Sequence, residues 1–404
     1  MDNVTHALAG ALLAAATCEF VTRRHGEPSS TFRRAAFAIG VVMAELPDGD
    51  LAYSGAVVGM GNLGYLLHHR GHTHTVLFVI VSAVIVWGLA LALRRELRAP
   101  AWAQALLTLS IVASASHLLL DYTNSYGVHP WWPIDKRWFY GDAVFIVEPW
   151  GWILALPPLL FIARGVVTRA LCAILLLVIV MVAWRVDLVG TGMAAVLTTG
   201  ALLWTGIVRA VPASRRVTTG IVAWLAMEGI FFTTSGIGRR IVRREVGESY
   251  RDVALSPAPG NPLCLSAVVV TEERGIYRTA SAAIAPLPAL RSATACRGAN
   301  GEMQERSDDP GQDTPAIHWG ASWSAPIGKL RALASSSCEV AAALRFMRVP
   351  GWQRKADGSI VLYDQRFGSG TNGFAHIVAH PGAPCPHPIP DWEWPRSDLL
   401  GKAP

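Results

Sequence analysis

Long apolar segments separated by short polar stretches dominate the first part of the chain, up to about residue 240. A membrane-spanning helix needs roughly 20 predominantly apolar residues, and eight segments reach or approach that length. The second is the weakest, because its apolar part covers only Ala35 to Leu46, so it is either a full span or a re-entrant helix. The segments lie at about 4–21, 33–46, 75–93, 101–123, 146–163, 166–184, 187–208 and 217–238.

The pattern changes near residue 245, where apolar stretches become short and Pro, Gly, Ser and Asp become frequent. Short stretches of alternating polarity broken by Pro and Gly are typical of strands. Residues Arg297–Pro315 have almost no apolar side chains and predict an exposed loop. Strands are expected at Cys264–Thr271, Gly275–Ile284, Leu344–Val349 and Ser359–Phe367.

Composition supports a membrane protein. Hydrophobic residues make up 52% of the chain and charged residues only 16%, with a mean hydropathy of +0.34. The net charge of +6 comes from arginine clusters between apolar segments, so nucleic-acid binding is not expected. We predict an all-α polytopic membrane domain of about eight transmembrane helices followed by a smaller β-rich soluble domain. The parts are residues 1–160, residues 161–244 with additional transmembrane helices, and residues 245–404.

The basic residues between the apolar segments predict the orientation of the chain. Twelve of them lie on one side and eight on the other, and the positive-inside rule places the larger set in the cytoplasm. The arginine run from Arg239 to Arg244 opposes this assignment. With eight spans, the C-terminal domain is then extracytoplasmic, and its four cysteines can form two disulfides. A cytoplasmic domain would instead contain four free thiols. The larger set is Arg23, Arg24, Arg33, Arg34, Arg94, Arg95, Arg98, Arg164, Arg169, Arg209, Arg215 and Arg216.

Histidine and aspartate residues gather at the ends of the first four predicted helices. His6 opens the first helix, and Pro47-Asp48-Gly49-Asp50 follows the second. The run His68–His74 precedes the third, while His117 and Asp121 end the fourth. Because consecutive spans alternate in direction, these four ends lie on the same membrane face. The predicted orientation makes that face extracytoplasmic.

These residue types suit a metal ion. His117 and Asp121 are four residues apart, so both project from one helix face, with Cβ atoms roughly 5–6 Å apart. Imidazole and carboxylate ligands favour Zn²⁺, with Mn²⁺ or another first-row ion as alternatives. Taken singly, each motif has a structural explanation, such as a buried His–Asp hydrogen bond or a turn at Pro47–Asp50. Four costly ionisable groups on one membrane face favour a metal site.

At these positions the sequence resembles the membrane-bound metal-dependent hydrolases of bacteria, including the LexA-regulated inner-membrane type, over roughly residues 1–160. The resemblance is carried by Asp2–His6 with Gly10, Pro47–Asp50, His69–His74 and residues 117–133. More distantly, the pattern is similar to that of zinc-dependent phospholipase C and nuclease enzymes, which cleave phosphoesters. Glu148 stands where the family pattern would have Asp. The resemblance implies a metal centre at His6, Asp48, His69, His74, His117 and Asp121, with Asp50 and Arg70 close by.

We therefore expect a hydrolase of the bacterial inner membrane that acts on a phosphoester or lipid-linked substrate at the extracytoplasmic face. The metal would activate water and polarise the scissile group. Asp50 or Glu148 is the expected general base, and Arg70 is expected to hold an anionic group. Glu45 is a further candidate near the site, and Glu228 lies within the last apolar segment. An ion transporter and a non-catalytic metal-binding sensor or scaffold are the alternatives. Membrane lipids are the expected partners.

Overall fold

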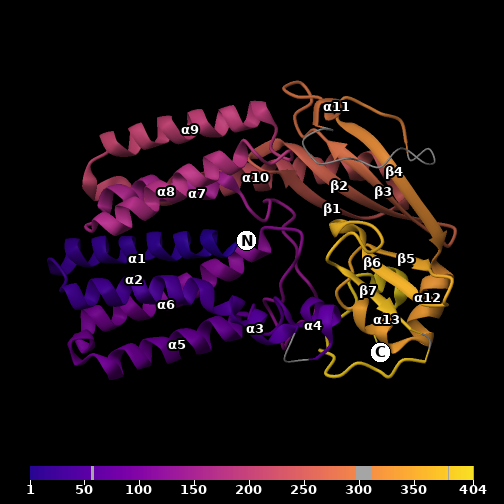
Figure 1. Ribbon diagram of the computed structural model, residues 1–404, viewed down its shortest axis with the longest axis horizontal. Helices are drawn as coiled ribbons and strands as arrows, with labels where there is room; N and C mark the ends of the chain where they lie inside the picture. The colour runs from indigo at the N-terminus through magenta and orange to yellow at the C-terminus, as the bar shows by residue number, and fades with distance from the viewer. Residues whose placement is uncertain (56–58, 297–310, 381, 404) are drawn as a thin grey trace.

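The computed structural model describes residues 1–55, 59–296, 311–380 and 382–403. A bundle of long helices occupies one end of the molecule, and two β-sheets with short helices occupy the other (Figure 1). The predicted order of a helical membrane domain followed by a smaller β-containing domain is confirmed.

The eight predicted apolar segments each form a helix of the bundle. Six of the helical segments are long and apolar enough to cross a membrane, whereas α2 and α7 are shorter. Eight complete spans are therefore not confirmed. The helices are α1 (Asn3–His25), α2 (Ser30–Glu45), α5 (Val76–Leu93), α6 (Pro100–Tyr122), α7 (Pro149–Ile162), α8 (Val166–Ala183), α9 (Thr191–Ala210) and α10 (Arg216–Val246).

Close packing of α1 on α2 brings two of the predicted motifs together. A Cβ on Gly10 would lie 2.2 Å from the backbone oxygen of Gly40, so only glycine permits this crossing. The contact sets the start of α1 beside the segment that follows α2. Three short helices then lead from α2 toward α5, namely η1 (Leu46–Asp50), α3 (Leu51–Ser54) and α4 (Gly61–His68). Turns η2 (Arg95–Arg98) and η3 (Ala213–Arg215) precede α6 and α10.

The C-terminal domain holds two antiparallel sheets. The first has the order β1-β2-β3-β4, and the second has the order β5-β6-β7. The strands are β1 (Tyr250–Ala258), β2 (Asn261–Glu273), β3 (Ile276–Ile284), β4 (Ile317–Pro326), β5 (Pro350–Arg354), β6 (Ile360–Asp364) and β7 (His376–Ala379). Short helices accompany them: η4 (Gly247–Ser249), α11 (Ala293–Cys296), α12 (Ile327–Ser336), α13 (Cys338–Ala343), η6 (Gln365–Phe367) and α14 (Ser397–Leu400).

Three of the four predicted strands lie within or around β2, β3 and β6, but the strand predicted at Leu344–Val349 is wrong. The Leu344 amide donates to the Val340 carbonyl, so this segment continues the turn that ends α13. Leu344, Phe346 and Met347 are all fully buried, and their apolar pattern therefore reflects a core turn instead of an alternating strand. Most of the predicted loop Arg297–Pro315, residues 297–310, lies outside the described residues.

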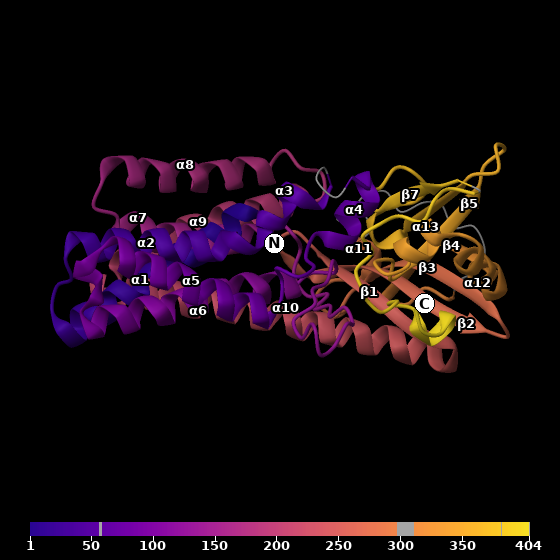
Figure 2. The same ribbon diagram turned by 90° about the horizontal axis from the view of Figure 1, so that it is seen from below.

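The C-terminal domain packs on the end of the bundle where the predicted motifs lie. Helix α10 continues out of the bundle and contacts β1 and β2 (Figure 2). The buried Arg348 forms ion pairs with Asp142 at 2.8 Å and Asp252 at 2.7 Å, and Arg239 reaches Asp142 at 2.6 Å. A buried pair is strongly destabilised when one partner is lost, so this network fixes the domain to the bundle.

Two disulfides stabilise the C-terminal domain. They join Cys264 to Cys296 and Cys338 to Cys385. Cys18 and Cys172, which lie in the bundle, are free thiols.

We predict that protein isolated from membranes and denatured without reductant has two thiols that react with a maleimide mass label. After reduction all six cysteines should react, because both disulfides then open. A Cys18→Ser/Cys172→Ser variant should show no labelling before reduction and serves as the control. Six reactive thiols without reductant would contradict both disulfides.

Candidate metal centre

Side chains from three separate segments converge at the end of the bundle. Asp48 comes from η1, His74 from the loop before α5, and His117 and Asp121 from the last turns of α6. One ligand atom from each of these four residues lies within 4.8 Å of the others. A second group, made of Asp48, Asp50 and His69, meets the same criterion and shares Asp48 with the first.

Hydrogen bonds fix which imidazole nitrogens are free to bind an ion. His117 Nδ1 lies 2.6 Å from the Ala44 carbonyl, which can only accept, so Nδ1 carries the proton. His74 Nδ1 lies 3.0 Å from the Thr73 hydroxyl oxygen, and that hydroxyl itself donates to Asp50 at 2.7 Å. In the neutral rings, both Nε2 atoms therefore present lone pairs, and they lie 3.0 Å apart.

The carboxylates complete a ring of acceptors. Asp121 Oδ2 lies 2.9 Å from His74 Nε2 and 3.4 Å from His117 Nε2. Asp48 Oδ1 lies 3.4 Å and 3.5 Å from the same two nitrogens. These separations are close to the ligand spacing of about 3.4 Å that a tetrahedral ion with bonds of about 2.05 Å requires. Asp48 Oδ1 and Asp121 Oδ2 are also buried without a hydrogen-bond partner, so the residues present fit a divalent cation.

The same surroundings hold a proton when no ion is bound. Burial by itself lowers the pKa of His74, but the neighbouring carboxylates of Asp121, Asp48 and Asp50 outweigh it and raise that pKa to about 10. A proton and a metal ion compete for such a nitrogen, so metal binding would release the proton.

Asp50 organises the histidine-rich loop. Its Oδ1 lies 2.8 Å from His69 Nδ1, while its Oδ2 accepts from the Arg70 amide at 3.0 Å and from the Thr73 hydroxyl at 2.7 Å. With both oxygens engaged and the residue fully buried, Asp50 is placed to orient His69 and His74. This placement suits a positioning residue better than the general base predicted from the sequence.

Arg70 and His6 flank Asp121 on the side away from the four-residue group. Arg70 lies 2.9 Å from Asp121 Oδ1 and donates to Asn124 at 2.9 Å, with its guanidinium over the Tyr126 ring. His6 stacks on His117 with ring centroids 3.8 Å apart, and its Nε2 lies 3.3 Å from Asp121 Oδ1. The Met1 α-amine also contacts Asp121 Oδ1. Oδ1 is thus held by these groups, which leaves Oδ2 for the centre.

Glu148 lies outside both groups of potential ligands. It caps α7 by accepting from the Trp150 amide and accepts from the Gly260 amide of the C-terminal domain, both at 3.1 Å. Burial raises the pKa of Glu148 to about 8. Glu45 is connected to the centre instead, since Asn3 donates to Glu45 at 3.0 Å and to Asp48 at 3.2 Å.

The C-terminal domain contributes a contact that the sequence did not reveal. Trp392 is fully buried and stacks on His129 at 3.8 Å, and its indole donates to the Leu67 carbonyl at 2.8 Å. Its ring also lies 4.8 Å from that of His72. Asn3 and Asn124 lie within the predicted motifs, so their positions in the sequence pointed to the site. Trp392 lies more than 300 residues after the histidine-rich loop, and no sequence pattern connects the two.

We predict that His117→Ala and Asp121→Ala each lower the amount of metal bound by the purified protein. Each change removes one of four converging ligands at a helix end, away from the packed apolar core. Elemental analysis measures the metal, and a thermal melt in detergent checks folding. Glu19→Gln removes a carboxylate at the other end of α1 and should leave metal content unchanged. Full metal content in both ligand variants would show that His117 and Asp121 are only hydrogen-bonded partners.

A second prediction concerns Glu148. A carboxyl with a higher pKa in the folded protein destabilises the fold as it ionises, here between its ordinary 4.5 and about 8. Glu148→Gln cannot ionise, so its melting temperature relative to the parent should rise as pH increases across that window. Parallel melting curves for the two proteins from pH 4.5 to 8 would show that Glu148 does not titrate there.

Comparison with known proteins gives a match for the N-terminal part of the chain, which carries the candidate metal centre. No curated protein and no solved structure matches the chain. Residues 1–192 match the profile of the YdjM inner membrane protein family. The match includes every residue proposed here as a ligand and ends at the start of α9, before the β-sheets. The region that holds the candidate metal centre is therefore similar to the YdjM inner membrane proteins, a bacterial inner-membrane family.

Proposed function

We propose that the protein is a membrane-bound, metal-dependent hydrolase that acts on a phosphoester or lipid-linked substrate at the extracytoplasmic membrane face. The observation that supports this most strongly is the convergence of Asp48, His74, His117 and Asp121, which bring two imidazoles and two carboxylates into one buried space. Zn²⁺ is the ion that this mixture of imidazole and carboxylate favours, with Mn²⁺ as the alternative.

A bound ion would supply an acidified water and would polarise the scissile group. The protein's own residues prepare the site for this. Asp50 and the Ala44 carbonyl orient the imidazoles of His74 and His117, and Arg70 with Asn124 orients Asp121. Glu45, held beside Asp48 by Asn3, has a buried Oε1 without a hydrogen-bond partner and is our candidate to accept a proton from water.

The disulfides support an extracytoplasmic site. Disulfides persist in oxidising compartments, and both lie in the domain that packs on the same end of the bundle as the centre. The arginine distribution points to the same side. The location of the centre at the ends of the helices, instead of at their middle, counts against an ion transporter.

A metal-binding sensor or scaffold is the second candidate. His74, His117 and Asp121 are fully buried, as in closed structural sites, where protein ligands fill every position. Asp48 remains partly exposed and is the side from which water or substrate could reach the centre.

The hydrolase proposal predicts that the purified parent protein cleaves at least one member of a panel of phosphoesters and phospholipids, and that a chelator stops the reaction. Adding Zn²⁺ or Mn²⁺ should restore it. His117→Ala should lower the rate by at least about a hundredfold, because losing a residue that only orients a metal ligand already costs roughly 10–100-fold. Leu177→Ala, on the surface of α8, is the control. A silent panel with stoichiometric metal would favour the sensor or scaffold.

A further inference from the structure

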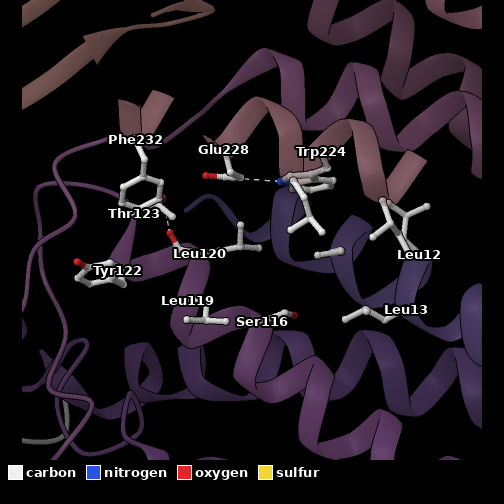
Figure 3. A pocket seen from close by; sticks show the side chains of 13 residues that line it. Leu12, Leu13, Ser116, Leu119, Leu120, Tyr122, Thr123, Trp224, Glu228 and Phe232 are labelled. Carbon is white, nitrogen blue, oxygen red and sulfur yellow. Dashed lines mark hydrogen bonds between the residues drawn. The ribbon is translucent and has the colours of Figure 1, made fainter. Parts of the chain in front are cut away.

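A groove of about 350 Å³ lies between α1, α6 and α10, within their membrane-spanning segments (Figure 3). Its volume falls in the range of roughly 300–1,000 Å³ found for small-molecule sites. The lining is almost entirely apolar, and five of its side chains are leucines: Leu12, Leu13, Leu119, Leu120 and Leu225. In this part of the protein the surrounding medium is hydrocarbon, so the natural occupant is a hydrocarbon chain.

The two ends of the groove lie at different levels of the bundle. Leu12 and Leu13 lie at one end, and Tyr122, Thr123 and Phe232 lie toward the other (Figure 3). Tyr122 ends α6, and His117 and Asp121 lie in the last turns of the same helix, so the Tyr122 end of the groove is the one near the metal centre. Ser116 adds no free polar group to the groove, because its hydroxyl donates to the Ala113 carbonyl at 2.7 Å.

Helix α6 separates the groove from the metal centre. Ser116, Leu120 and Thr123 recur at intervals of three and four residues and line the groove. His117 and Asp121 follow Ser116 and Leu120 directly and face the centre. A molecule in the groove therefore lies one helix away from the candidate ligands, and the end of the groove lined by Thr123 is the one beside Asp121.

Glu228 gives the groove a specific polar contact. One of its carboxylate oxygens accepts from the Trp224 indole at 3.1 Å, while the other, Oε2, is buried without a partner. An acidic group within a membrane-spanning segment is costly unless it is paired. A ligand with a hydroxyl or ammonium donor at this depth would supply the missing partner once the Glu228 side chain turns into the groove.

We propose that this groove binds one acyl chain of a phospholipid. The chain lies along Leu12 and Leu13, and a donor group of the lipid reaches Glu228 near Thr123. Naming this phospholipid as the substrate rests on the proposed hydrolase function, but binding of the chain itself does not require hydrolysis.

The test uses the full-length protein in nanodiscs that contain a phosphatidylethanolamine with a photoreactive diazirine on one acyl chain. After illumination, mass spectrometry should find labelled peptides of α1, α6 and α10 well above those of α8. Leu119→Trp narrows the groove at an exposed position and should lower this labelling about tenfold, which corresponds to about 1.4 kcal/mol of binding free energy. Leu177→Trp, at a similarly exposed position of α8, is the matched control and should not lower it.

The carboxylate is tested with a second probe. Phosphatidylcholine has no N–H donor, so the parent should label more strongly with the ethanolamine probe than with a matched choline probe. Glu228→Leu should abolish that difference while chain labelling remains. Equal labelling of α8 and the groove overturns the proposal whatever the hydrolysis assay gives. Selective groove labelling in a protein that hydrolyses none of the panel supports lipid binding here and counts against the proposed enzyme.

Discussion

The structure depends on one electrostatic constraint, namely that four acceptor atoms face each other in a buried space. The backbone of Ala44 and the side chain of Thr73 direct the protons of His117 and His74 away from the centre, so both Nε2 atoms point inward with Asp48 and Asp121. Two imidazoles and two carboxylates in one buried space need a proton or a metal ion between them, because buried acceptors need a donor or an ion. Helix packing, including the Gly10–Gly40 contact, thus brings together residues that could hold a cation.

The surrounding shell balances charge on the far side of Asp121. Arg70 adopts a left-handed backbone conformation with φ of 58°, which turns its guanidinium toward Asp121 and over Tyr126. The C-terminal domain then covers this shell, with Trp392 against the histidine-rich loop. Arg348 of the C-terminal domain forms an ion pair with Asp142, which holds the domain on the bundle. Loss of the C-terminal domain would thus expose the histidine-rich loop.

Alternation of helix direction was sufficient to predict that His6, Asp48, His74, His117 and Asp121 meet at one end of the bundle. It was not sufficient to assign their roles. Asp48 and Asp50 lie in the same 3₁₀ turn, two residues apart. The sequence alone does not show that Asp50 hydrogen-bonds to the histidine-rich loop while Asp48 joins His74, His117 and Asp121. Glu148 was predicted near the centre, but its partner is Gly260, a distant residue that no local pattern connects to it. Six of the described helical segments, instead of eight, are long enough to span, because α2 has 16 residues and α7 has 14, fewer than the roughly 20 that a span needs.

Helix α6 contributes residues both to the candidate metal centre and to the groove proposed to bind lipid. A helix places residues one position apart about 100° around its axis, so Ser116 and Leu120 line the groove while His117 and Asp121 face the candidate metal centre. A phospholipid chain held on the first face brings its polar end to the last turn of α6, where Asp121 lies. Helix α6 would then keep hydrocarbon away from the candidate metal-binding residues and also set the depth at which a lipid approaches them.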